Sequence, residues 1–248
     1  MQIEEGLTMS DEEAQAMKTL GEMLERAPLS SDEKIQHIYL FTHRRTIAKL
    51  LWMDHIYREI VNVPGVIAEF GVHFGRNLAL FESLRGVHEP YNFSRKILGF
   101  DTFSGFFSIS DKDPNANLGG LSVPENYKNF LQQVLTAQSG LNPHANRNHI
   151  ELYEGNAPDK LRDYLDAHPE TIFAMIHLDI GLYKPTIECL ELASDHLVGG
   201  SIICFDQLND PNWPGDTLAM KHFEGLSQKK FVRLPFSGNA TYVKILAD

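Results

Sequence analysis

Two aspartates that follow apolar runs late in the chain could together hold a divalent cation. Asp179 ends the run IFAMIHLDI (172–180), and Asp206 ends the run SIICFDQ (201–207). If these runs are neighbouring strands of a parallel sheet, about 4.8 Å apart, both carboxylates converge outside its carboxyl edge. Oxygen ligands without a Cys or His cluster favour Mg²⁺. The alternative is that each aspartate caps the following helix or accepts a hydrogen bond from a loop amide.

The chemistry expected of such a site is the activation of a hydroxyl group. A bound Mg²⁺ lowers the pKa of a coordinated hydroxyl and holds it in line with an electrophile. We therefore take Asp179 and His177 as the candidate catalytic residues. His177 lies two residues before Asp179, on the same strand face but deeper, and a core or supporting role is the alternative for this histidine.

A glycine-containing turn earlier in the chain indicates a cofactor site. The segment IAEFGVHFGRN carries Glu69, Gly71 and Gly75 in an ExGxxxG pattern ahead of a predicted helix. Glycines at such a turn let a ligand approach the backbone closely. His73 stands where a dinucleotide fingerprint needs its second glycine, so a nicotinamide cofactor is disfavoured. An acid before the turn suits a ligand with a cationic amino acid moiety instead.

Two further strand ends carry polar residues suited to a nucleoside. Asp101 ends the run KILGFDT (96–102), and a carboxylate there can accept hydrogen bonds from both hydroxyls of a ribose. Asn156 ends the run HIELYEGN (149–156), and its side chain could bind an adenine edge. The alternative is that the glycines merely form turns and the acids cap helices. The candidate cofactor-binding set is Glu69, Gly71, His73, Gly75, Asp101, Thr102, Ser104, Asn156 and Asp179.

Five short apolar runs should position these residues. They are VIAEFGV (66–72) and the four runs named above, and helix-like segments lie between them. Strands that alternate with helices of about 10–15 residues imply crossover connections and a parallel sheet covered on both faces. We therefore predict a doubly wound, Rossmann-like α/β fold.

The end of the chain has a different pattern. FVRLPF and ATYVKIL, joined by SGN, predict an antiparallel hairpin. The hairpin would complete a mostly parallel seven-stranded sheet. A parallel core that ends in such a hairpin resembles the sheet of class I methyltransferases. The helix after 172–180 is predicted to carry an apolar stripe as far as Leu197 and to end at Gly199-Gly200.

The first 60 residues are predicted to form a helical cap, and residues 61–248 the cofactor-binding domain. Ser30 and Glu33 have capping-box spacing ahead of one of the cap helices. Residues 103–123 are polar and rich in Gly, Pro and Asn, and a loop of that length is usually a functional lid or a disordered insertion. Its aromatic residues Phe103, Phe106 and Phe107 could face a sugar or an apolar aglycone, or simply pack in the core.

Composition excludes several classes of function. The formal net charge is −11, with 22 Lys+Arg against 33 Asp+Glu, so nucleic-acid binding is not expected because phosphate contacts need clustered cations. Cys189 and Cys204 form no CxxC motif, which disfavours a zinc site or a disulfide framework and favours the cytoplasm. No apolar run approaches the roughly 20 residues needed to cross a bilayer, so no membrane association is expected.

Four motifs together resemble the macrocin O-methyltransferase family over roughly residues 60 to 246: EFGVHFGRN, GFDTFSGF, HLDIGLYKPT and CFDQ. The resemblance implies that Glu69 and Gly71 lie at the methionine side of S-adenosylmethionine, that Asp101 binds its ribose, and that Asp179 and Asp206 bind Mg²⁺. The family usually has a second aspartate where this chain has Gln207, whose amide oxygen can still bind Mg²⁺. Its LDGD motif is LDIG here, so an acid is missing at Gly181.

The resemblance implies an S-adenosylmethionine-dependent, Mg²⁺-dependent O-methyltransferase that acts on a hydroxyl of a sugar or glycosylated small molecule. The metal ligands would be Asp179, Asp206 and Gln207. The alternatives are a nicotinamide-dependent sugar oxidoreductase and a methyltransferase-fold binding protein that the changes at Gly181 and Gln207 have disabled. The N-terminal helices could also form a surface for a homo-oligomer.

Overall fold

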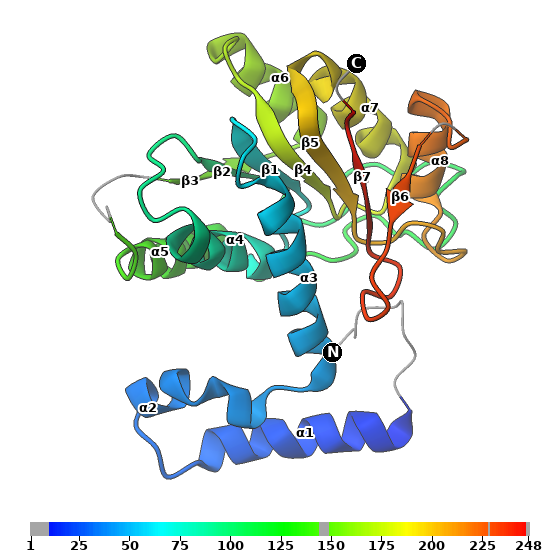
Figure 1. Cartoon of the computed structure of the whole chain (residues 1–248). Coiled ribbons are helices and arrows are strands. Elements are labelled where there is room, and N and C mark those ends of the chain that lie inside the picture. The colour runs from blue at the N-terminus through cyan, green and yellow to red at the C-terminus, as the bar shows by residue number, and fades with distance from the viewer. Residues whose placement is uncertain (1–9, 144–148, 228, 247–248) are drawn as a thin grey trace. The chain divides into compact units, whose positions relative to one another are not determined.

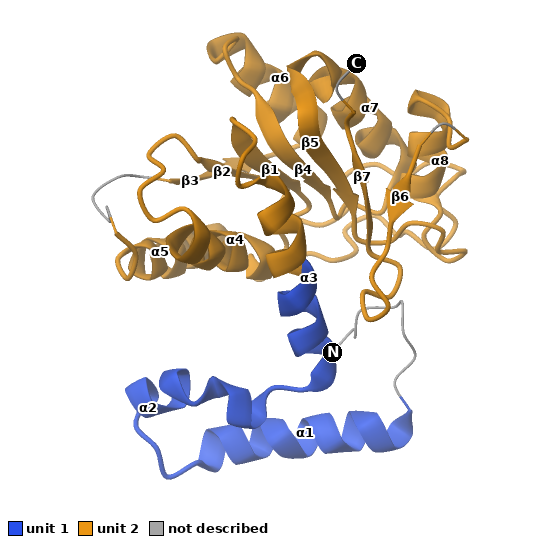
Figure 2. Ribbon diagram, in the orientation of Figure 1, with its two compact units in different colours: residues 1–52 blue, residues 53–248 orange. Residues whose placement is uncertain are grey.

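The chain divides into two compact units, residues 1–52 and 53–248 (Figure 2). The computed structural model describes residues 10–143, 149–227 and 229–246. The second unit contains the whole sheet and all the candidate site residues named above.

The first unit is helical. Its elements are α1 (Asp11–Arg26), α2 (Ser31–Gln36), the 3-10 helix η1 (Ile38–Phe41) and the start of α3 (Arg44–Ile60). The predicted capping box is confirmed, because the Ser30 hydroxyl accepts a hydrogen bond from the Glu33 amide and the Glu33 carboxylate accepts one from the Ser30 amide. Ser10 and Glu13 form a second capping box at the start of α1.

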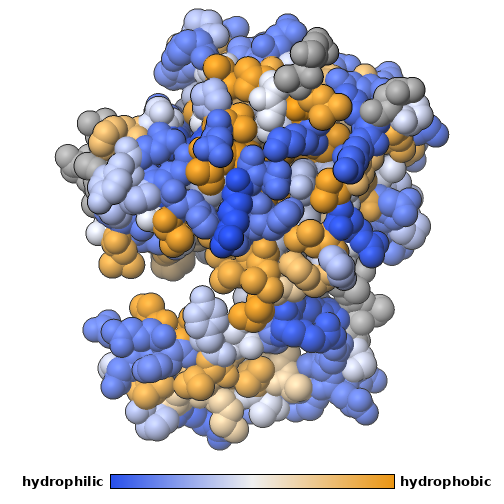
Figure 3. Space-filling model, in the orientation of Figure 1, coloured by the Kyte–Doolittle hydropathy of each residue, from blue (hydrophilic) through white to orange (hydrophobic). Residues whose placement is uncertain are grey.

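Large hydrophobic side chains are exposed on this unit. Ile35, Tyr39 and Leu40 are 72%, 64% and 68% exposed, and hydrophobic residues are visible on the surface of the unit in Figure 3. Exposed apolar side chains that gather in one region are typical of interaction surfaces.

The second unit contains one seven-stranded sheet of order β3-β2-β1-β4-β5-β7-β6 (Figure 1). Strands β1 to β5 are parallel to one another, whereas β7 runs antiparallel to both β5 and β6. The predicted class I methyltransferase fold with a C-terminal antiparallel hairpin is therefore confirmed. The strands are β1 (Val66–Phe70), β2 (Ile97–Asp101), β3 (Ile150–Glu154), β4 (Phe173–Leu178), β5 (Leu197–Phe205), β6 (Phe231–Val232) and β7 (Thr241–Lys244).

Helices cover both faces of the sheet (Figure 1). One core consists of the strand residues Ala68, Phe100 and Ile176 packed with Leu161 of α6 and Leu190 of α7. On the other face, His177 of β4 contacts the ring of Phe81 in α4. The helices of this unit after α3 are α4 (Arg76–His88), α5 (Tyr127–Ser139), α6 (Ala157–Ala167), α7 (Tyr183–Ala193), the 3-10 helix η2 (Ser194–His196) and α8 (Gly215–Phe223).

Two predicted boundaries are wrong. Helix α7 ends at Ala193, and Gly199-Gly200 lie inside β5, which already begins at Leu197. Leu197 pairs with Phe173 of β4, and the register then shifts before Met175 pairs with Ile202, so an irregular strand start accommodates the glycines. The hairpin also has shorter strands than expected, with residues 233–240 between β6 and β7.

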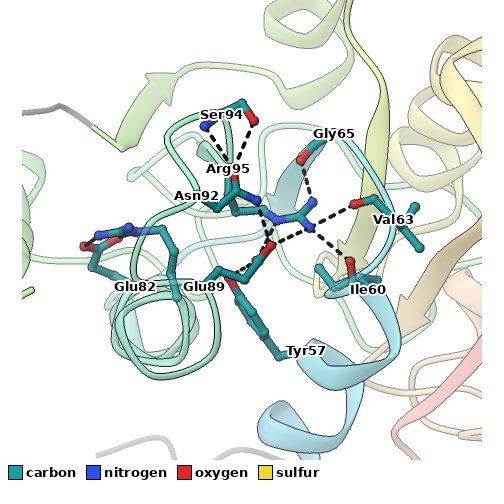
Figure 4. A network of polar contacts seen from close by, with 10 residues as sticks. Tyr57, Ile60, Val63, Gly65, Glu82, Glu89, Asn92, Ser94 and Arg95 are labelled. Carbon is teal, nitrogen blue, oxygen red and sulfur yellow. Dashed lines mark hydrogen bonds and ion pairs between the residues drawn. The ribbon is translucent and has the colours of Figure 1, made fainter. Parts of the chain in front are cut away.

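A buried ion-pair network fastens the end of α3 to the sheet (Figure 4). Arg95 donates hydrogen bonds to both carboxylate oxygens of Glu89 and to the carbonyl oxygens of Ile60, Val63 and Gly65. The Tyr57 hydroxyl donates to Glu89 Oε2 at 2.7 Å. Burial alone would raise the pKa of Glu89, but hydrogen bonds from Arg95 and Tyr57 lower it overall.

Candidate functional site

A pocket opens at the carboxyl ends of the parallel strands, which is where α/β folds bind ligands. The hollow contains about 620 Å³ of space, part of it open to solvent. Residues from the ends of β1, β2, β3 and β4 meet there with the segment 103–123. The lining includes Gly71, His73, Asp101, Thr102, Asn156 and Asp179, together with Phe106, Phe107, Leu121, Ile180 and Leu182.

Backbone amides hold the Asp101 carboxylate in place at the end of β2. Its Oδ2 accepts a hydrogen bond from the His73 amide at 2.7 Å, and its Oδ1 accepts one from the Phe103 amide at 2.6 Å. Both donors have positive φ angles, 50° at His73 and 53° at Phe103. Non-glycine residues in this conformation are uncommon and gather at functional sites. The His73 backbone therefore adopts the left-handed conformation that glycine usually provides, while its side chain lines the pocket.

The two glycines of the first turn have different reasons to be glycine. Gly71 has φ 94°, and a Cβ there would lie 2.3 Å from the carbonyl oxygen of Asp179. A Cβ at Gly75, which has φ 79°, would lie 2.3 Å from Leu131 Cδ1 of α5. Gly71 therefore lets the β1 and β4 ends approach each other at the pocket, whereas Gly75 lets α5 pack against the turn.

Four polar side chains gather between β1, β4 and the start of α4. Ligand atoms of Glu69, His177 and Asp179 lie within 4.8 Å of one another. The Asn77 amide bridges the two carboxylates, with Nδ2 donating to Glu69 Oε1 at 2.6 Å and to Asp179 Oδ2 at 3.2 Å. Glu69 and His177 are fully buried, so of the three only Asp179 reaches the pocket lining.

This group contains more acceptors than donors. Glu69 Oε2 and Asn77 Oδ1 are buried acceptors without a hydrogen-bond partner. The two ring nitrogens of His177, at least one of which carries a hydrogen, also have no hydrogen-bond partner. His177 Nδ1 lies 3.5 Å from Glu69 Oε1. Buried acceptors without partners are costly, so the arrangement suits a cationic ligand that supplies hydrogen-bond donors from the pocket side.

Asp206 and Gln207 follow β5, the neighbour of β4. Leu178 pairs with Phe205, and the Asp206 amide donates to the Leu178 carbonyl at 3.0 Å, so Asp179 and Asp206 occupy matching positions after their strands. Gln207 Oε1 would lie 3.4 Å from a Cβ built on Gly181. The amide oxygen therefore lies near the position from which an acid is missing. The described residues that line the pocket include Asp179 but neither Asp206 nor Gln207.

The segment 103–123 covers part of the pocket and is fixed to the start of α7. Asp113 Oδ1 accepts a hydrogen bond from the Tyr183 amide at 2.8 Å, and its Oδ2 accepts from the hydroxyl and the amide of Ser110. Lys112 Nζ lies 3.5 Å from the centroid of the Tyr183 ring, a cation–π contact. Asp113 is 5% exposed, so this attachment is shielded from solvent.

A second buried acid lies where α7 and α8 pack together. Asp216 of α8 accepts a hydrogen bond from the Thr186 hydroxyl of α7 at 2.9 Å, while its Oδ2 has no partner. Burial raises the pKa of Asp216 to about 7, and the charges of Asp206 and Asp113 add to that rise. No sequence pattern singled out this residue.

The sequence-predicted residues divide into three groups. Six of the cofactor candidates line the pocket: Gly71, His73, Asp101, Thr102, Asn156 and Asp179. Glu69 lies beneath the pocket and is linked to Asp179 by the Asn77 amide. Gly75 allows α5 to pack against the turn. Ser104 is exposed and its amide donates to the Thr102 hydroxyl at 3.2 Å. Sequence reasoning missed Asn77, Asp113 and Asp216. Asn77 ends the motif EFGVHFGRN, but each of these three side chains has a partner that lies far away in the chain, Asp179, Tyr183 and Thr186 respectively, and the sequence does not show that contact.

Comparison with solved structures gives two strong similarities. The crystal structure of CalS11, a calicheamicin methyltransferase, is 37% identical, with a TM-score of 0.93 over 98% of this chain and 96% of that chain. The apo structure of CalS11, a TDP-rhamnose 3'-O-methyltransferase, is 36% identical, with a TM-score of 0.86 over 96% of each chain. The O-methyltransferase NovP is 17% identical, with a TM-score of 0.59 over 81% of each chain, and supports the fold alone.

Neither a protein-family model nor a curated protein sequence matches the chain. Among the described residues, no helix is long and apolar enough to span a membrane.

Proposed function

The chain belongs to the macrocin O-methyltransferase family, as its similarity to CalS11 shows, and we propose that this chain transfers the methyl group of S-adenosylmethionine to a sugar hydroxyl. The observation that carries the proposal is the pocket at the carboxyl edge, where Asp101 and Asp179 face one cavity from two strand ends. A donor with a ribose at one end and a cationic amino acid at the other matches these two carboxylates.

Each part of the donor has a proposed partner. Asp101, already oriented by the His73 and Phe103 amides, accepts hydrogen bonds from the ribose hydroxyls through its remaining lone pairs. Gly71 and Asp179 bind the methionine end, and the buried Glu69 supports Asp179 through the Asn77 amide. Asn156, at the start of α6, contacts the adenine, and Thr102 and His73 complete the wall.

Methyl transfer is an in-line displacement, in which the acceptor oxygen forms a bond to the methyl carbon as the bond from carbon to sulfur breaks. The protein mainly has to align the two groups and exclude water. The acceptor hydroxyl also has to lose its proton, and Asp179 is the proposed acceptor of that proton. His177 is fully buried beside Glu69, so we propose a supporting role for it rather than contact with the sugar.

Mg²⁺ is a proposed cofactor. Asp179, Asp206 and Gln207 supply oxygen donors on adjacent connections, which is the ligand type that Mg²⁺ prefers. A bound ion would lower the pKa of the acceptor hydroxyl.

The acceptor proposed for this chain is a nucleotide-linked deoxysugar or a related glycoside of natural-product biosynthesis, by analogy with the substrate named for CalS11. The segment 103–123, with Phe106 and Phe107 in the pocket lining, forms part of the acceptor cover. We also propose that residues 1–60 act as a helical cap, that the exposed apolar side chains of the first unit support a homo-oligomer, and that the protein works in the cytoplasm.

The experiment is a methyl-transfer assay with S-adenosylmethionine and a panel of nucleotide sugars and glycosides, read by mass spectrometry. A product heavier by one methylene, formed more slowly after chelation and restored by Mg²⁺, is the expected result. Turnover that is unaffected by chelation would remove the metal from the proposal. Oxidation of a sugar with a nicotinamide nucleotide would support the oxidoreductase alternative instead, and binding without turnover on any acceptor would support a disabled enzyme.

A further inference from the structure

Asn77 is the second residue of α4 and lies beneath the pocket. Its side chain is 4% exposed. A single nitrogen, Nδ2, donates to Glu69 Oε1 at 2.6 Å and to Asp179 Oδ2 at 3.2 Å. The primary amide of asparagine carries two hydrogens on one nitrogen, so one atom satisfies an oxygen of each carboxylate.

The two carboxylates belong to adjacent strand ends. Glu69 pairs with His177 in the register of β1 and β4, and Asp179 follows β4 directly. Two acids this close repel each other unless a donor or a cation lies between them. A hydroxyl has one hydrogen and could serve only one acid, and a carboxylate at position 77 would add a third negative charge. Asparagine therefore has the donor geometry that this pair requires.

We propose that Asn77 is a positioning residue for the methyl donor: it fixes the Asp179 carboxylate in the pocket wall and links it to the buried Glu69. The inference rests on the proposed function, since it assumes that the donor's cationic end binds at Asp179. Asn77 itself does not line the pocket, so it acts through the two carboxylates. Without Nδ2, Asp179 loses the bond that sets its side-chain orientation, and the preformed site for the donor is lost.

The test is calorimetric titration of the full-length protein and its variants with S-adenosylmethionine and with its demethylated product. Asn77→Asp keeps the shape of the side chain but removes both amide hydrogens. We expect it to weaken binding of both ligands about 10- to 100-fold, the range for loss of hydrogen bonds to a charged group. The KM for the acceptor, measured at saturating donor, should change less than the affinity for the donor, because Asn77 does not line the pocket and contacts neither ligand itself.

The chain contains a matched control. Asn142 also donates from Nδ2 to a carboxylate, Glu82 Oε1, at 2.9 Å, and to the Glu82 carbonyl, but neither residue lines the pocket. Asn142→Asp should lower thermal stability and leave donor binding unchanged. A second variant, Asn77→Ser, retains one donor hydrogen and should bind the donor with an affinity between those of the wild-type protein and Asn77→Asp, which provides a test if the aspartate variant does not fold.

Each outcome has a distinct meaning. If the wild-type protein binds no S-adenosylmethionine, the proposed function fails. If the wild-type protein binds it and folded Asn77→Asp or Asn77→Ser binds it equally well, the role of Asn77 is wrong. If Asn142→Asp weakens donor binding as much as Asn77→Asp does, the effect is general destabilisation and the positioning role is again wrong.

Discussion

The Asp101 carboxylate is oriented at both of its oxygens, because two residues with left-handed backbone conformations direct their amides at them. Such preorganisation reduces the entropy lost when a ligand binds. It also explains why His73 is tolerated where a dinucleotide site needs glycine: its backbone already has a φ of 50°, and no pyrophosphate has to lie against it.

Asp101→Asn should weaken S-adenosylmethionine binding about 10- to 100-fold, because one amide hydrogen of asparagine would face a backbone N–H and the charge that attracts the ribose hydroxyls is lost. Glu154→Gln is the control, since Glu154 pairs with Asp101 in the β2–β3 register but is exposed. Equal donor affinity for Asp101→Asn and the wild-type protein, measured by calorimetry, would contradict a ribose-binding role.

The buried Asp216 predicts an unusual dependence of stability on pH. Its carboxyl releases a proton near the ordinary pKa of 3.8 in the unfolded chain and near 7 in the folded chain. Between these values the folded state binds more protons at Asp216, so the contribution of this residue to the free energy of unfolding falls as pH rises through this window and is constant above it. Ionisation of Asp216 in the folded protein lowers the free energy of unfolding by at most about 4 kcal/mol.

Asp216→Asn cannot ionise and should remove this decline. In urea unfolding at several pH values, with a chelator present, the free energy of unfolding of the variant should rise relative to that of the wild-type protein as the pH approaches about 8. The expected relative increase is up to roughly 4 kcal/mol. Asp195→Asn, at an exposed position, is the control. Parallel pH profiles for Asp216→Asn and the wild-type protein would contradict the raised pKa.

Residues at strand ends were the ones that could be predicted. Six cofactor candidates that line the pocket, including Asp101, Asn156 and Asp179, lie at or just after the ends of β1, β2, β3 or β4, and apolar runs mark such ends in the sequence. Asn77, Asp113 and Asp216 were not predicted, because their roles depend on partners from other elements. Asp113, for example, accepts a hydrogen bond from an amide 70 residues away.

At the scale of elements, the network around Arg95 joins the end of α3, the connection into β1 and the end of α4 (Figure 4). Arg95 is 1% exposed and Glu89 is 7% exposed. Removal of one partner leaves the other charge buried without compensation, which typically costs about 3–5 kcal/mol.

Arg95→Met should therefore lower the free energy of unfolding by about 3–5 kcal/mol, because methionine fills much of the volume but leaves the Glu89 carboxylate without its cationic partner and three carbonyl oxygens without their donor. Arg162→Met is the control, since the ion pair of Arg162 with Asp159 is exposed and such pairs contribute about 0–1 kcal/mol. A loss below about 1 kcal/mol for Arg95→Met in urea unfolding would mean that the network does not hold these elements together.

The attachment of the segment 103–123 to α7 gives a further prediction. Asp113→Ala removes its bonds to the Tyr183 amide and to Ser110 and should increase the rate of proteolysis within the segment about tenfold or more. Asp111→Ala, at an exposed position, should have no effect. Equal rates for both variants in limited proteolysis, followed by mass spectrometry, would show that Asp113 does not fix the cover.

Element types were predictable and some boundaries were not. The alternation of short apolar runs with helical segments correctly gave β1 to β5, because strands buried on both faces are continuous apolar runs. Gly199-Gly200 resembled a helix end, yet they belong to β5, where pairing with neighbouring strands overrides the local preference of glycine. The short β6 and β7 depend on that pairing in the same way.

At the scale of the second unit, the strand order places the ends of β1 and β4 side by side at the centre of the sheet. Chain connections run to opposite sides from such a point, which leaves a crevice for a ligand. The order therefore brings Asp101, Gly71 and Asp179 to one pocket, and the antiparallel strand β7 with the edge strand β6 completes the sheet beyond β5.

The most direct test of the methyltransferase assignment is calorimetric titration of the wild-type protein with S-adenosylmethionine, repeated with Asp101→Asn and Asp179→Asn. We predict that one donor molecule binds each chain and that each substitution weakens binding about 10- to 100-fold. Full affinity in both variants would contradict a donor site at the strand ends of this pocket. Absence of donor binding by the folded wild-type protein would contradict the assignment itself.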